Sequence, residues 1–410
     1  MPVVSSITDR LRAALDAAEA RRPGISHQLE AMFAAAHAEA SAVLDGTVAH
    51  ATLGSAAGAW AALHADVVGL EHHVALAAKD PRDAVPVYVS KSGELWGVGT
   101  YENLDPGWTE ALIHYVEHLD DRAPFVTAPK VIDIPDTTTL AIVGDWGTGY
   151  WRAGTGAEAV AKQVAAMAPD YAIHLGDVYY AGASDEERDK LLALWPRGRR
   201  GSITLNSNHE MYDGAHAYFA ALSADGPFAL QGGCSYVALR NAHWLVLGLD
   251  TAYDATGHMY LDGAINAAQL GFLAAMAAAA GDRKVVLVSH HEGLTLDGSA
   301  TTALWQQVVR GLGRPPTAWY WGHQHNGVVY TTRDGCAPRC IGHGAIPYGN
   351  ATMLAGVPTV QWSESVSAGD PCVPHRVSNG FARVTLDGAT LREELVAEDG
   401  TVRWRGEVSA

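Results

Sequence analysis

The stretch LAIVGDWG, residues 140–147, and the stretch YAIHLGDVYY, residues 171–180, share one pattern, a short apolar run followed by Gly-Asp. Between them, GAEAVAKQVAAMA at 156–168 carries apolar residues at helical spacing. A strand, a helix and a second strand in this order indicate an α/β unit, in which the site lies at the strand ends. We therefore expect Asp145 and Asp177 to lie at one edge of a sheet.

The same alternation continues towards the C-terminus. Apolar runs predict strands at 244–250, 284–290 and 317–323, and helical periodicity predicts helices at 267–280 and 301–312. Residues 380–408 alternate apolar and polar side chains and contain Asp-Gly turns, which favours two or three antiparallel strands. The pattern predicts an α/β domain over residues 139–410.

The N-terminal part of the chain has a different pattern. Apolar residues recur at helical spacing over much of 6–78 and again over 106–121, and residues 85–101 read as a hairpin around Lys91–Glu94. We predict a mainly helical region over residues 1–125, which packs on the α/β domain, and a Pro-containing linker over residues 126–138.

Composition limits the classes of partner. The 410 residues include 28 Lys and Arg against 45 Asp and Glu, a formal net charge of −17. This charge repels polyanions, so duplex nucleic acid is not an expected partner. No apolar run reads as a membrane span or a secretory signal, so we expect a cytoplasmic protein, with a homo-oligomer left open. Cys336, Cys340 and Cys372 could form a small metal site or a disulfide, or be ordinary buried thiols.

Candidate metal ligands occur in five short clusters, each at the end of a predicted strand. Each cluster alone is weak, since Gly-Asp after a strand is usually a turn and an isolated Asn-His pair says little. Together they supply seven or eight nitrogen and oxygen donors in one α/β region, a set that suits iron, zinc or manganese. The residues are Asp145, Asp177, Tyr180, Asn208, His209, His290, His323 and His325.

The order of these clusters is similar to that of a known superfamily. The chain resembles the calcineurin-like metallophosphoesterases over roughly residues 138–408. The motifs that carry this resemblance are, in order, GDWG, GDxxY, NHE, a strand-terminal His and GHxH. Tyr180 and Trp146-Gly147 resemble the purple acid phosphatases within it. The resemblance implies a metallophosphoesterase-type β-sandwich flanked by helices and does not cover the N-terminal helical region. Ser207 and Leu287 depart from it, because the family has Gly and Val there.

The resemblance also implies residue roles. Asp177 would bridge two metal ions, most simply iron with a second iron, zinc or manganese. His209 would contact phosphate and protonate the leaving group, oriented by Glu210. His291, beside His290, is expected either to contact substrate or to be structural. The stretch IGHGAIPYG at 341–349 resembles the family's Gly-rich loop, which would place His343 near the substrate. One ion would be held by Asp145, Asp177, Tyr180 and His325, and the other by Asp177, Asn208, His290 and His323.

This ligand set predicts a hydrolase of small phosphate esters. Two cations about 3.5–4 Å apart clamp phosphoryl oxygens and lower the pKa of a bound water, so a metal-bound hydroxide is the expected nucleophile. A phosphomonoesterase is the first expectation. A phosphodiesterase on the same site and a non-catalytic scaffold that uses the fold for partner binding are the alternatives.

Overall fold

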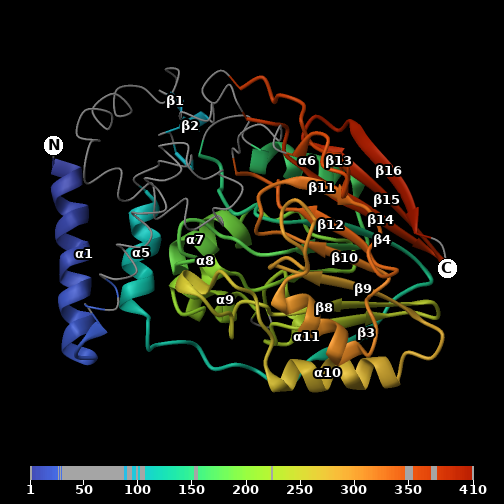
Figure 1. Cartoon of the computed structure of the whole chain (residues 1–410), viewed down its shortest axis with the longest axis horizontal. Coiled ribbons are helices and arrows are strands. Elements are labelled where there is room, and N and C mark those ends of the chain that lie inside the picture. The colour runs from blue at the N-terminus through green and yellow to red at the C-terminus, as the bar shows by residue number, and fades with distance from the viewer. Residues whose placement is uncertain are drawn as a thin grey trace.

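The computed structural model describes residues 2–25, 27, 29, 87–89, 95–97, 100–101, 107–151, 156–222, 225–346, 354–370 and 376–408. It is a mixed α/β structure with two large sheets and flanking helices, as Figure 1 shows. A separate hairpin pairs β1 (Val87–Val89) with β2 (Leu95–Gly97) and confirms the predicted one. Over the described part of the chain, no helix combines the length and apolar character needed to span a membrane.

The six-stranded sheet combines two kinds of pairing. Its central strands β4, β5 and β6 are parallel, and β14, β15 and β16 extend it as an antiparallel meander. The meander confirms the strands predicted in the C-terminal tail. In order across the sheet, the strands are β16 (Val402–Val408), β15 (Thr390–Ala397), β14 (Gly380–Asp387), β4 (Thr137–Val143), β5 (Tyr171–His174) and β6 (Gly201–Thr204).

The eight-stranded sheet has a parallel centre, in which β8, β9, β10 and β12 run in one direction. Its edge strand β3 lies inside the range predicted as a linker, so residues 130–133 are part of a sheet. In order, the strands are β13 (Val360–Ser363), β11 (Gly327–Tyr330), β12 (Ala337–Ile341), β10 (Ala318–Trp321), β9 (Lys284–Ser289), β8 (Trp244–Gly248), β7 (Val237–Arg240) and β3 (Lys130–Asp133).

The two sheets share one hydrophobic cluster, to which alternate residues such as Ile142 and Ile173 contribute from one sheet and Val286 and Val288 from the other. The opposite faces are covered by helices. α6 (Gly156–Met167) packs on the six-stranded sheet, and α10 (Ala267–Ala278) and α11 (Ala303–Leu312) pack on the eight-stranded sheet. Burial on both faces explains why β4, β5 and β9 read as continuous apolar runs.

Two helices from the N-terminal part are described, α1 (Pro2–Arg21) and α5 (Trp108–Glu117), and they lie side by side in Figure 1. Ala14 and Ala18 of α1 share a hydrophobic cluster with Leu112 and Val116 of α5. The cluster also includes Tyr212, which belongs to the α/β part of the chain. The helices predicted between residues 30 and 78 lie outside the described residues.

Candidate metal centre

The predicted ligands follow the ends of strands from both sheets. Asp145 and Asp177 come two and three residues after β4 and β5, and His290 directly follows β9. The segment after β10 carries His323 and His325, and α8 (Asn208–Tyr212) begins with Asn208 shortly after β6. Because carboxyl ends of parallel strands meet at one edge of a sheet, the fold brings these side chains together.

Four of these residues have left-handed backbone conformations, which few residues with side chains adopt. The φ angles are +56° at Asp145, +75° at Asp177, +63° at His323 and +43° at His325. Such conformations cost about 1–3 kcal/mol each and persist where the surrounding structure enforces them, most often at functional sites. The strand ends are therefore built to aim these four side chains.

Two glycines allow the strand ends to approach closely. A Cβ atom on Gly322 would lie 2.5 Å from Oδ2 of Asp145, and one on Gly342 would lie 2.8 Å from the same oxygen. Only a residue without a side chain fits at these two glycine positions. The close approach also lets the backbone N–H of His323 donate to both carboxylate oxygens of Asp145 at 3.0 Å.

One group of donors gathers around Asp145. Nε2 of His325 lies 3.3 Å from Oδ1 of Asp145 and 3.5 Å from Oδ2 of Asp177. Burial and the charge of Asp177 raise the pKa of Asp145. Burial lowers the pKa of His325, but hydrogen bonds to both carboxylates outweigh it and raise the pKa to about 9. The buried carboxylates of Asp145 and Asp177 therefore favour a positive charge close to both of them.

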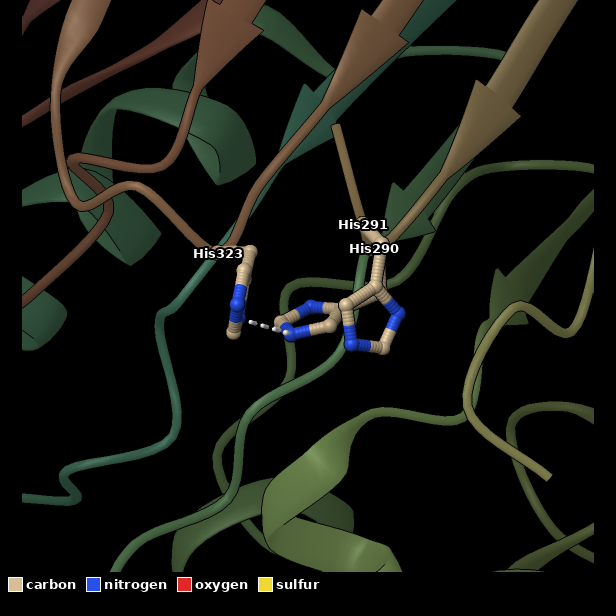
Figure 2. A group of neighbouring side chains, drawn as sticks. All are labelled: His290, His291 and His323. Carbon is tan, nitrogen blue, oxygen red and sulfur yellow. Dashed lines mark hydrogen bonds between the residues drawn. The ribbon is translucent and has the colours of Figure 1, made fainter. Parts of the chain in front are cut away.

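A second group gathers around the other oxygen of Asp177. Nε2 of His290 lies 3.4 Å from Oδ1 of Asp177, 2.8 Å from Oδ1 of Asn208 and 3.1 Å from Nδ1 of His323. Figure 2 shows the rings of His290 and His323 turned towards one another, with the ring of His291 beside them. The two oxygens of Asp177 therefore face different sets of donors.

The contacts of His290 fit a cation. Its Nδ1 lies 3.0 Å from the carbonyl oxygen of Leu175, so Nδ1 carries the proton, and burial lowers its pKa to about 3. Nε2 of this neutral ring then has only a lone pair. Asn208 donates through Nδ2 to the hydroxyl of Tyr212 at 2.7 Å, which turns its Oδ1 towards His290. Two acceptors 2.8 Å apart repel one another unless a cation lies against both.

The two adjacent tyrosines lie in different surroundings. The hydroxyl of Tyr179 donates to Oδ2 of Asp177 at 2.8 Å and lies 3.2 Å from Nε2 of His325. The ring of Tyr180 packs against Tyr101 and Trp108, with ring centroids 4.9 and 5.0 Å apart. The structure thus brings Tyr179 to the centre, a residue that sequence reasoning missed, and turns Tyr180 towards the N-terminal part of the chain.

His209 lies next to the centre, slightly farther from the carboxylates than the candidate ligands. Its Nε2 is 3.9 Å from Oδ2 of Asp177, and its Nδ1 is 2.6 Å from the carbonyl oxygen of Tyr180. Burial lowers the pKa of His209, although the charge of Asp177 opposes this effect. The carbonyl of Tyr180, rather than Glu210, orients the ring.

Ser207 fits the site without strain, although the resembled family has Gly at this position. Its φ of −132° is an extended conformation that any residue adopts. Its hydroxyl accepts from the N–H of His209 at 3.1 Å and donates to Oδ1 of Asp177 at 2.6 Å. Glu210 contacts the Ser207 hydroxyl and accepts from the N–H of Asp177 at 3.3 Å. Both side chains hold the Asp177 segment in place.

His291 and His343, the two residues expected to contact substrate, are both buried. Both ring nitrogens of His291 have protein partners, the hydroxyl of Thr251 at 3.0 Å and the carbonyl oxygen of Tyr260 at 2.9 Å. The ring of His343 lies against Gly327 and Gly380, whereas the preceding Gly342 approaches Asp145. A substrate role for His291 would require it to release one partner.

The cysteines that are described form no disulfide. Cys336 and Cys340 are free and buried, and burial raises the pKa of both thiols well above the ordinary value. These two side chains match the expectation of ordinary buried thiols. Cys372 lies outside the described residues.

Comparison with known proteins gives weak likenesses. No protein-family model and no curated protein matches the chain. It is similar to the structure of Plasmodium GAP50, "the anchor in the inner membrane complex", with 11% identity, 67% of this chain and 89% of that chain covered, and a TM-score of 0.48. A predicted phosphoesterase of Streptococcus pneumoniae shares 10% identity over 67% and 98% of the chains, with a TM-score of 0.29. Vacuolar protein sorting 29 of Cryptosporidium parvum shares 13% over 67% and 99%, with a TM-score of 0.33. Likenesses of this size are too weak to support a family assignment or a function.

Proposed function

We propose that the chain is a metal-dependent hydrolase of phosphate esters with a dinuclear centre bridged by Asp177. The observation that carries this proposal is the buried Asp177 carboxylate, whose Oδ1 lies near His290 and whose Oδ2 lies near His325. A carboxylate with donors on both oxygens suits two adjacent cations. The mixed nitrogen and oxygen set suits iron with a second iron, zinc or manganese.

Bound cations would supply charge to neutralise phosphoryl oxygens and would acidify a water molecule. The protein side chains do the rest. Tyr212 fixes the amide of Asn208, and Leu175 fixes the tautomer of His290. His209 presents Nε2 beside Asp177 while its Nδ1 is held by the carbonyl of Tyr180, so it is the candidate to hydrogen-bond phosphate and to pass a proton to the leaving oxygen.

A closer relation to the purple acid phosphatases depends on a tyrosine ligand to ferric iron. The sequence pattern assigns this role to Tyr180, whereas the contacts with Asp177 and His325 favour Tyr179. We propose that one of these two phenols binds iron, and that Tyr179 is the better placed.

A phosphomonoesterase is the preferred activity, and a phosphodiesterase uses the same donors. Since the net charge of −17 disfavours a nucleic-acid duplex, a small phosphate ester is the proposed substrate. A non-catalytic scaffold is the second candidate. It is less favoured because the candidate ligands are all present and most of them converge.

The experiment is a metal analysis of the purified full-length chain followed by activity on two esters, p-nitrophenyl phosphate and bis-p-nitrophenyl phosphate. We expect at least two metal ions per chain and faster hydrolysis of the monoester. Faster hydrolysis of the diester would make the chain a phosphodiesterase. The scaffold would be favoured if the chain bound two metals but hydrolysed neither of these esters nor an unactivated phosphate ester.

A further inference from the structure

Within the described residues, α5 carries a second group of metal-ligand side chains away from the strand ends. His114, Glu117 and His118 each offer a ligand atom, and these atoms all lie within 4.8 Å of one another. The residues stand at positions i, i+3 and i+4, which share one face of a helix. The two imidazole rings are nearly parallel, with an interplanar angle of 7° and centroids 6.0 Å apart. The helix therefore presents three donors side by side.

Each histidine of this group has one ring nitrogen held by an acceptor. Nδ1 of His114 lies 3.0 Å from Oδ1 of Asp213, and Nδ1 of His118 lies 3.0 Å from the carbonyl oxygen of His114. With both Nδ1 atoms donating, the Nε2 atoms of the neutral rings carry lone pairs. Metal-binding histidines almost always have this arrangement, in which the other nitrogen donates to a carboxylate or a carbonyl.

The surroundings of the group favour a cation. The side chain of His114 is 23% exposed, so an ion can reach it from solvent, and the side chain of Asp213 behind it is 12% exposed. Asp121 lies close by and contacts Nε2 of His216 at 3.3 Å. The guanidinium of Arg21 is engaged by the backbone, since it donates to the carbonyl oxygens of Val116 and Glu117 at 3.4 and 3.0 Å. His216 begins α9 (His216–Ala221), and its ring centroid lies 5.9 Å from that of His118.

We infer that His114, Glu117 and His118 form a site for one divalent transition-metal ion of the zinc class, separate from the centre at the strand ends. Two imidazoles and one carboxylate suit zinc, and three protein ligands leave a coordination position for water. Asp213 directly follows α8, the helix that begins with Asn208. Since Asp213 holds Nδ1 of His114, the proposed site lies where α5 contacts the segment that leads from the candidate centre.

The test uses the full-length chain, stripped with a chelator and titrated with Zn²⁺ alone. Bound zinc per chain and its affinity are measured for wild type, His118→Gln and Glu117→Gln. We expect His118→Gln to lose one equivalent of zinc, or to bind it at least about tenfold more weakly, because a ligand is gone. Glu117→Gln tests the exposed ligand and keeps the experiment decisive if His118→Gln does not fold. The matched control is His243→Gln, an exposed histidine on another part of the surface, which should bind zinc as wild type does.

Equal stoichiometry and affinity in wild type and both α5 variants would overturn the inference. This result is distinct from failure of the proposed hydrolase. If the centre at the strand ends bound no metal, all variants would lose the same zinc, and the difference between wild type and His118→Gln would remain. The melting temperature adds a second readout. Zinc should raise it more in wild type than in His118→Gln, because an ion that binds only the folded chain stabilises it.

Discussion

Two regions with different supports border the candidate centre. One is the set of segments that follow β4, β5, β9 and β10, and the other is the beginning of α5. Asp145, Asp177 and His290 leave the ends of strands that are buried on both faces. α5 instead rests on α1 and on Tyr212 through a small apolar cluster, and its Trp108 ring lies 5.8 Å from the ring of His209. The strand ends hold candidate ligands in left-handed backbone conformations, whereas Trp108 of α5 packs beside them.

This difference separates two kinds of residue at the site. We expect the proposed chemistry to depend on side chains that follow the strands of the two sheets, so that a change of donor there should weaken metal binding. The α5 layer acts through packing, so its residues should influence stability and access to the centre before they influence chemistry. Substitutions in each region test whether this division holds.

The largest effect is expected for Asp177→Asn. Asn is similar in shape and tolerates the left-handed backbone at this position, but it loses the charge that faces both groups of donors. Losing several kcal/mol of charge stabilisation predicts a fall in kcat/KM of about 10³ or more. Metal content should fall by at least one ion per chain relative to wild type. The control is Asp189→Asn, a surface carboxylate paired with Arg188. Unchanged metal content in Asp177→Asn would remove Asp177 from the bridge.

The next effect concerns packing of the N-terminal helices. Leu112 of α5 is fully buried in the cluster with Ala14, Ala18 and Tyr212. Leu112→Ala should lower the free energy of unfolding by about 3 kcal/mol, measured by urea titration. Val131→Ala, at a side chain 38% exposed, is the control and should cost under about 0.5 kcal/mol. Equal small costs for both variants would show that α5 does not pack on the α/β part of the chain.

His209→Ala tests chemistry without loss of metal. The side chain lies farther from Asp177 than His290 or His325 does, so both ions should remain. Loss of general acid assistance predicts a fall in kcat of about 10² on an alkyl phosphate. The fall should be smaller on p-nitrophenyl phosphate, whose leaving group needs little protonation. A variant that lost one metal would instead identify His209 as a ligand.

The two tyrosines give a smaller and more local comparison. If a phenolate binds ferric iron, the chain absorbs in the visible, and Tyr179→Phe should remove the band while Tyr180→Phe keeps it. Loss of a hydrogen bond to the charged Asp177 should also lower kcat by about tenfold in Tyr179→Phe. If Tyr180→Phe instead removed the band and Tyr179→Phe kept it, Tyr180 would be the iron ligand. An iron-loaded chain without a visible band would exclude both phenols as iron ligands.

Much of the centre could be predicted because its signal is local. An apolar run followed by Gly-Asp or Gly-His predicts both a strand and a donor at its end, and parallel strands bring such ends together. Asp145, Asp177 and His323 were expected at the centre in this way, and Asn208, His290 and His325 were expected there from the neighbouring clusters NSNHE, VSHHE and GHQH. The position of these donors at strand ends can therefore be predicted without knowledge of long-range packing.

What could not be predicted depends on distant contacts. No strand was predicted over β12, which contains Pro338 and Arg339. Arg339 is buried in the structure, where Glu393 of β15 pairs with its Nε at 3.1 Å. The sequence also does not predict which of the two tyrosine side chains, Tyr179 or Tyr180, points towards the centre, since the two residues are adjacent and both aromatic. Tyr101 and Trp108, from a part of the chain far away in sequence, form the apolar surface on which Tyr180 packs.

The smallest effect is expected at Asp170, which directly precedes β5 and so lies at the end of the sheet opposite the centre. Its carboxylate accepts from the N–H and hydroxyl of Thr139 at 2.9 and 3.0 Å and from Arg199 at 2.9 Å. Burial raises the pKa of Asp170, but these hydrogen bonds and the arginine charge outweigh it, so the pKa is lowered. Asp170→Asn should cost about 1 kcal/mol at pH 7, since the exposed Arg199 adds little.

A lowered pKa fixes the sign of the pH dependence of this effect. The ionised carboxylate is favoured by folding, so its stabilisation is complete above the unfolded pKa of about 3.9 and is lost as the pH falls through the lower folded value. Urea unfolding of wild type and Asp170→Asn should therefore differ at pH 7 and pH 5 and converge towards pH 3. A difference that persisted at low pH would mean that Asp170 acts through its shape rather than its charge. Activity should not change in this variant, because Asp170 contacts the strands at the end opposite the donors, and the strand ends alone hold the centre.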